Sequence, residues 1–216
     1  MNQVVLVDRD RKIIKEIDRW RVCLGRHIRE LAGFSGQRAC DRRLRKLIDG
    51  EYIKREKILY GVAGIYRNTV KAAKIERLPN VSNRKIRIEQ IKHDIAVLDA
   101  VIFFGKNHGI QYENIKSEIE LHRQDGFGIR KHRPDFVFTK DGKTICVEVE
   151  LSLKARNRFE NIIKENYRVY DSQIWIVPSL DTKMASILKK NKSTYNNIHV
   201  LSLSKIQDQN EKTEKG

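Results

Sequence analysis

The chain has 216 residues, of which 44 are Lys or Arg and 28 are Asp or Glu, so its formal net charge is +16 at pH 7. A hydrophobic share of 40% argues against wholesale disorder, and no apolar run approaches the roughly 20 residues of a membrane-spanning helix. A large positive surplus usually accompanies a polyanionic partner, most often nucleic acid. The chain start lacks a secretory pattern, and Cys23, Cys40 and Cys146 form neither a disulfide framework nor a zinc motif. We therefore expect a cytoplasmic protein with no membrane partner.

The first 80 residues carry more than half of the positive surplus. Apolar residues at helical spacing predict a first helix with Asp8 as its N-cap, and Gly50 is a stop signal for the third helix. The expected elements are helices over residues 9–20, 24–31 and 35–50, then strands over residues 51–61 and 63–72. Three helices followed by a basic hairpin resemble the winged helix-turn-helix fold over residues 8–75, and this resemblance implies DNA binding.

The third expected helix carries most of the polar and basic side chains that a DNA-binding surface needs. With Ala39, Leu44, Leu47 and Ile48 facing a core, the remaining side chains are left for solvent, and Asp41 is the only acid among them. The candidate DNA-contacting residues are Gln37, Arg38, Arg42, Arg43, Arg45 and Lys46. A helix fits the major groove of B-DNA, where Arg and Gln read base edges and other cations contact phosphates. The alternatives are a plain solvated helix face and a protein-docking module.

The segment 78–83 contains Leu-Pro-Asn and Ser-Asn and predicts a domain boundary. We expect a winged helix-turn-helix domain over residues 1–78, an α/β domain over residues 84–205 and a disordered tail over residues 206–216. The α/β domain is expected to contain helices over residues 88–105, 152–170 and 181–190 and strands over residues 114–123, 133–139, 143–151, 173–178 and 196–203. This order of elements predicts a mixed sheet.

The dipeptide Asp141-Gly142 between two alternating segments is a strong signal for a tight β-hairpin. A turn centred on this dipeptide places Asp135 directly opposite Glu148, and strand alternation puts Glu150 on the same face. Like charges that lie about 4.5–5.5 Å apart repel each other, so three clustered carboxylates favour a bound divalent cation such as Mg²⁺ or Mn²⁺. The alternative is a structural ion network with nearby cations. Those cations are Arg133, Lys154, Arg156 and Arg158.

Arg133-Pro134-Asp135 on one strand and Glu148-Val149-Glu150 on the next resemble the motif of the PD-(D/E)xK nuclease superfamily. The resemblance implies that Asp135 and Glu148 bind Mg²⁺, while the third position, usually Lys, helps to activate water. Glu150 occupies that position here, and Lys154 is the cation that the following helix would supply. The resemblance also implies a further acid. Its candidates are Asp94, Glu118 and Glu120.

A longer resemblance covers nearly the whole chain. The chain contains, in order, the winged-helix segment, His93-Asp94 on a helix, the strand RPDFVF, the segment VEVELSLKARNRF and a helix end with Tyr167 and Tyr170. Together these features resemble the replication-relaxation family of plasmids and conjugative elements. The resemblance implies a double-stranded DNA partner, with replication or relaxase proteins as further partners, and leaves a homodimer open. Two functions follow: a Mg²⁺-dependent DNA endonuclease acting in plasmid replication or mobilisation, or a non-catalytic DNA-binding accessory factor or transcriptional regulator.

Overall fold

The computed structural model describes residues 4–58, 60–79, 86–126, 128, 131–153 and 155–215. Over these residues the chain is a mixed α/β protein with helices α1–α9 and two sheets. It divides into two compact units, residues 1–98 and 99–216, and the division falls inside the long helix α5 (Ile88–His108). The sequence-based boundary at residues 78–83 lies earlier, and most of that segment is outside the described residues.

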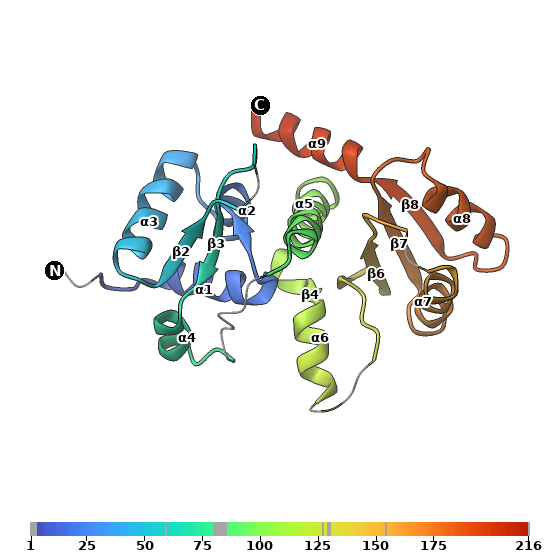
Figure 1. The fold of residues 1–216 in the computed structure, drawn as a ribbon, viewed down its shortest axis with the longest axis horizontal. Helices are drawn as coiled ribbons and strands as arrows, with labels where there is room; N and C mark the ends of the chain where they lie inside the picture. The colour runs from blue at the N-terminus through green and yellow to red at the C-terminus, as the bar shows by residue number, and fades with distance from the viewer. Residues whose placement is uncertain are drawn as a thin grey trace. The chain divides into compact units, whose positions relative to one another are not determined.

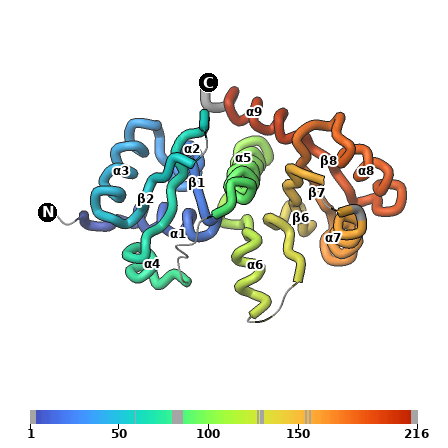
Figure 2. The backbone as a smooth tube through the Cα atoms, in the orientation of Figure 1, coloured from blue at the N-terminus to red at the C-terminus, as the bar shows by residue number. Residues whose placement is uncertain are grey.

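The first unit combines helices with a small antiparallel sheet whose strand order is β1-β3-β2 (Figures 1 and 2). Its elements are α1 (Asp8–Trp20), β1 (Cys23–Leu24), α2 (Gly25–Leu31), α3 (Gln37–Asp49), β2 (Ile53–Glu56), β3 (Ile65–Asn68), α4 (Val70–Glu76) and the first half of α5. The three expected helices and two strands are therefore present in the expected order. Gly36 and Gly50 flank α3 as its N-cap and C-cap, as the sequence predicts.

Several local predictions in this unit are wrong. Val7 rather than Asp8 is the N-cap of α1, and its N–H donates to the Asp10 carboxylate at 2.8 Å. The expected strand over residues 63–72 stops at Asn68, because the Thr69 hydroxyl accepts a hydrogen bond from the Ala72 N–H and caps helix α4. Ala39 is exposed, and Cys40 takes the core position that was expected for it.

The second unit is built on a five-stranded mixed sheet of order β4-β5-β6-β7-β8. The first three strands pair antiparallel and the last three pair parallel, which confirms the predicted α/β class with a mixed sheet. Besides the second half of α5 it contains η1 (Tyr112–Asn114), β4 (Lys116–Ser117), α6 (Glu118–Asp125), β5 (Phe136–Lys140), β6 (Lys143–Val149), α7 (Arg156–Val169), β7 (Ser172–Val177), α8 (Lys183–Asn191), β8 (Ile198–Ser202) and α9 (Leu203–Lys215).

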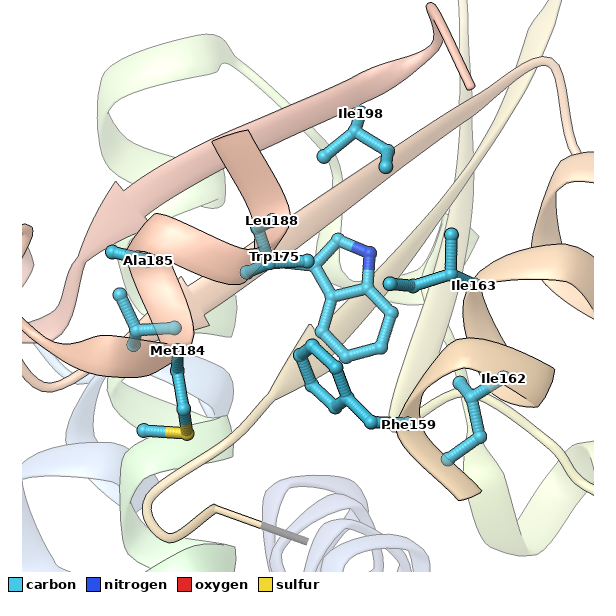
Figure 3. Close-up of a cluster of buried hydrophobic side chains, with 9 residues drawn as sticks. Phe159, Ile162, Ile163, Trp175, Met184, Ala185, Leu188 and Ile198 are labelled. Atoms are coloured by element: carbon cyan, nitrogen blue, oxygen red, sulfur yellow. The ribbon is translucent and has the colours of Figure 1, made fainter. Parts of the chain in front are cut away.

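Each face of this sheet is covered by helices. On one face the Phe104 ring of α5 packs against Phe136 and Phe138 of β5, with ring centroids 6.0 and 5.1 Å away. On the other face α7 and α8 enclose Trp175 of β7, whose ring meets Phe159 edge to face at 4.9 Å (Figure 3). The cluster around Trp175 consists of Phe159, Ile162, Ile163, Val177, Met184, Ala185, Leu188 and Ile198. This packing fixes α7 over the sheet face that carries the acidic residues.

Two expected elements of the second unit are replaced by helices. The predicted strand over residues 114–123 shortens to β4, because Ser117 and Glu120 form a capping box that starts α6. Where a disordered tail was expected the structure has a helix, α9, which runs to Lys215. Its Ile206 is only 2% exposed, and its Gln207 amide donates to the Asp99 carboxylate at 2.9 Å.

If α9 is a folded part of the second unit, truncating its buried side chain must destabilise the protein. We expect Ile206→Ala to cost about 2–5 kcal/mol and to lower the melting temperature by roughly 4–20 °C. The neighbouring exposed residue provides the control, and Lys205→Ala should leave the melting temperature unchanged. Equal melting temperatures for both variants in differential scanning calorimetry would mean that α9 is not packed.

Candidate functional site

Helix α3 presents a polar and basic face to solvent. Five of the six side chains expected to contact DNA are exposed, namely Gln37, Arg38, Arg42, Arg45 and Lys46. Cys40, Leu44 and Leu47 on the opposite side are buried in the core of the first unit. The four cations of this exposed set form no ion pair within the described part of the chain. Their charges are therefore available to an anionic partner.

Arg43 differs from the other cations of α3. Its guanidinium pairs with both oxygens of Asp10, which is completely buried in α1, and also donates to the Val5 carbonyl at 3.2 Å. The hydrogen bond to Asp10 raises the pKa of Arg43 above its ordinary value. Arg43 thus ties α3 to α1, and we assign it a structural contact in place of the expected contact with DNA.

The register of the β5–β6 hairpin is the one the sequence predicts. Phe136 pairs with Val147 and Lys140 pairs with Lys143 across the Asp141-Gly142 turn. Asp135 directly precedes β5, so the next position across the ladder is Glu148. The Asp135 Oδ2 atom accepts a hydrogen bond of 2.6 Å from the Val149 N–H, which fixes this carboxylate against β6. The register thus agrees with the expected placement of Asp135 beside Glu148.

Glu148 is a buried carboxylate, only 4% exposed. Burial raises its pKa above the ordinary value, and the negative charge of Asp135 adds to the rise, whereas hydrogen bonds from His132 and Asn166 oppose it. The His132 Nε2 atom lies 2.7 Å from Glu148 Oε1, and the Asn166 amide donates to the same oxygen at 2.8 Å. Neither partner was expected from the sequence.

The signal for His132 was its position three residues before Asp135, at the entrance to the strand of the motif. Asn166 gave a weaker signal, as a polar residue among the apolar positions of a helix expected to face the sheet. It is only 2% exposed in α7. Buried amides almost always have hydrogen-bond partners, so its partner had to be sought on the sheet.

Glu150 follows β6 and is also only 4% exposed. Its N–H donates to the Ile176 carbonyl at 2.8 Å, which continues the parallel ladder beyond Val149. Alternation along the strand puts its side chain on the face of Glu148. Lys154, expected to supply a cation, lies outside the described residues.

Two other charged candidates near the acidic face, Arg133 and Glu120, have structural partners. Arg133 forms two hydrogen bonds with Asp125, so it serves α6 and not the expected ion network with the three acids. Glu120 belongs to the capping box of α6. The remaining candidate in this unit is Glu118, whose N–H donates to the Asp135 carbonyl at 2.8 Å.

Asp94, the candidate acid in α5, belongs to the first unit. Arg21 donates to both of its oxygens at 3.0 and 3.1 Å, and the Gln90 amide adds a third bond at 2.7 Å. The neighbouring His93 lies with its Nδ1 atom 3.6 Å from the same carboxylate. These contacts join α5 to the turn after α1 and give Asp94 a structural role.

The donor set of the acidic face fits a hard divalent cation. Within the described residues no group of three His, Cys, Asp or Glu side chains is arranged as metal ligands. Mg²⁺ needs no such group, because it usually keeps several waters and binds one or two carboxylates. Glu148 suits this role, since the hydrogen bonds with His132 and Asn166 both end on Oε1.

Comparisons with known proteins leave the function to be argued from these residues. No protein-family model matches the chain, and no curated protein matches its sequence. None of the described helices is long and apolar enough to cross a membrane. The two features that bear on function are therefore the exposed basic face of α3 and the acidic sheet face of Asp135, Glu148 and Glu150.

The raised pKa of Glu148 predicts how stability depends on pH in the absence of metal. Because the folded-state pKa lies above the unfolded value, the folded protein loses stability as the pH rises from about 4.3 through the folded-state pKa. Glu148→Gln removes this loss and keeps an oxygen for His132 and Asn166. In EDTA at pH 7 the variant should melt at least about 2 °C above the wild type, and the difference should shrink towards pH 4.5. A wild type that is the more stable protein at pH 7 would contradict the raised pKa.

Proposed function

We propose that the protein binds double-stranded DNA through helix α3, and that its first unit is a winged helix-turn-helix module. The observation that carries the proposal is the exposed set Gln37, Arg38, Arg42, Arg45 and Lys46 on one helix. A helix of this width fits the major groove. The glutamine and arginines provide donors for base edges, while the remaining cations neutralise phosphates.

The proposal predicts a specific loss of affinity and of salt dependence. Replacing Arg42, Arg45 and Lys46 with Ala should weaken binding to a short duplex at least about tenfold and flatten the log–log salt slope by roughly 2–3, since each phosphate contact contributes about 0.9. Fluorescence anisotropy at several salt concentrations measures both quantities. The matched control removes three exposed cations from other helices, Lys15, Lys74 and Lys189. Equal affinities and slopes for the two triple variants would remove α3 from the DNA interface.

Arg43→Ala separates structure from binding on the same helix. The variant leaves the buried Asp10 carboxylate without its guanidinium partner, which should cost roughly 2–3 kcal/mol of stability. At a temperature where the variant is folded, fluorescence anisotropy should give an affinity for DNA within about threefold of the wild type, because the Arg43 guanidinium is held by Asp10 and is not one of the proposed DNA contacts.

We also propose a second function, a Mg²⁺-dependent DNA phosphodiesterase on the acidic sheet face. The observation that favours it is the register of the β5–β6 hairpin, which brings Asp135 beside Glu148, a buried carboxylate whose pKa is raised by burial and by the charge of Asp135. Such a pair is unfavourable on its own and gains stability from a cation. When bound, Mg²⁺ would polarise the phosphoryl group and lower the pKa of a bound water.

Asp135 and Glu148 would hold the cation, with Glu150 on the same face to orient water. Lys154 remains the proposed cation for charge that develops on the phosphate. The replacement of the usual Lys by Glu150 favours the alternative, a non-catalytic accessory factor or regulator. Either form agrees with a role in plasmid replication or mobilisation, as the resemblance to the replication-relaxation family implies.

Cation binding and strand cleavage test the second function separately. If the acidic face binds a divalent cation with a dissociation constant of about 50 μM, then 5 mM Mg²⁺ or Mn²⁺ is about 100 times that constant. Binding should then raise the free energy of unfolding by about 2.7 kcal/mol. Glu148→Gln should abolish the rise. Nicking of supercoiled DNA should need the cation and should disappear in Asp135→Ala. Nicking that persists in Asp135→Ala, or a melting temperature insensitive to both cations, would show that the acidic face is not this site.

A further inference from the structure

Two donors from separate elements converge on one oxygen of Glu148. The His132 Nε2 atom lies 2.7 Å from Oε1, and the Asn166 Nδ2 atom lies 2.8 Å from the same Oε1. His132 belongs to the irregular segment that leads into β5, and Asn166 belongs to the last turn of α7. Both donors are thus held by structure outside the strand that carries Glu148.

The two donors differ in exposure in a way that matters for their role. Asn166 is 2% exposed, so it is packed between α7 and the sheet and cannot turn towards solvent. The His132 side chain is 24% exposed to solvent, whereas the Glu148 side chain is 6% exposed. A buried carboxylate group that accepts two hydrogen bonds on one oxygen has little freedom to rotate. The direction of its other oxygen, Oε2, is therefore fixed as well.

We propose that His132 and Asn166 are positioning residues that clamp Oε1 of Glu148 and thereby present Oε2 to a divalent cation. The proposal rests on the phosphodiesterase function above, because it takes the cation site of Asp135 and Glu148 as given. Asp135 is fixed in a similar way, since the Val149 N–H donates to its Oδ2 atom at 2.6 Å. Each carboxylate is thus oriented by donors that would not themselves touch the cation.

Fixed orientation is what a cation site built from only two carboxylates requires. Mg²⁺ demands a near-ideal octahedral arrangement, and each torsion left free in a ligand must be ordered on binding. Hydrogen bonds to ligating carboxylates therefore carry much of the affinity, and their loss typically costs 10–100-fold. Among the three acids of this face, Glu148 is the one on which His132 and Asn166 are seen to converge.

The test compares variants that remove a donor with one that keeps it. Titration calorimetry with Mn²⁺ measures affinity in the wild type, in His132→Leu, in Asn166→Leu and in His132→Gln, whose amide keeps a donor at the reach of Nε2. We expect the two Leu variants to lose at least about tenfold in Mn²⁺ affinity and His132→Gln to stay within about threefold. His199→Leu removes an exposed imidazole from β8 and should leave the affinity unchanged.

The outcomes separate this proposal from the function on which it rests. Wild-type affinity in both Leu variants would overturn the clamp while leaving the cation site intact. An absence of Mn²⁺ binding by the wild type would overturn the cation site and the clamp together. If Asn166→Leu does not fold, the comparison of His132→Leu with His132→Gln decides alone, because the partly exposed His132 can be replaced without opening the core. Equal loss in these two His132 variants would also overturn the clamp.

Discussion

The register of the β5–β6 hairpin determines what every residue near the acidic face can do. A shift of the pairing by one position would move each side chain of the shifted strand to the opposite face of the sheet. Phe136 and Phe138 would then lose their contacts with Phe104, and Asp135 would leave the surface of Glu148. The Asp141-Gly142 turn suppresses this shift, because both residues have positive φ angles, 50° and 74°, and a two-residue turn of this kind permits one register. Core packing and the acidic face therefore depend on the same turn.

The acidic face is energetically unfavourable for the folded protein when no cation is bound. A buried carboxylate costs stability unless it is hydrogen-bonded or paired, and Glu148 lies next to a second acid on a sheet whose other face is wholly apolar around the Phe104 ring. The fold limits the cost with His132 and Asn166 and with the Val149 N–H on Asp135. Three separate elements thus converge on two side chains. Arg133, the cation closest in sequence, pairs with Asp125 and so does not neutralise these acids.

The sequence predicted those parts of the fold that depend on local patterns. Helix α3 was bounded correctly because glycines flank a clear apolar stripe, and the hairpin was placed because Asp-Gly fixes both its turn and its register. The segment at Ser117 was misread, since its alternating Ile and Glu residues resemble a strand while the decisive feature is the capping box from Ser117 to Glu120. Helix α9 was missed because its sequence is largely polar, although Ile206 is buried and the Gln207 and Asn210 amides contact Asp99.

The hydrogen-bond partners of Glu148 could not be predicted from local sequence patterns, for a different reason. His132 and Asn166 lie 16 and 18 positions from Glu148 in the chain, and nothing in a strand or helix pattern specifies which buried amide meets which carboxylate. The same applies to Arg43, which looked like one more cation of a basic helix until its contact with the buried Asp10 was seen. In both cases a titratable side chain is defined by a partner on another element, so its role follows from tertiary packing.

The charge of the chain gives a reason for both features to occur in one protein. A net charge of +16 would favour the proposed DNA partner at long range, whereas an acidic face without a cation would repel its phosphates. A divalent cation on that face would reverse the local sign, and the repulsion between Asp135 and Glu148 would become attraction to the same ion. Cation binding and phosphate binding on this face would then be coupled, each raising the affinity for the other by the same factor. Without such coupling the acidic face would only weaken the contact with DNA that the surplus of lysine and arginine favours.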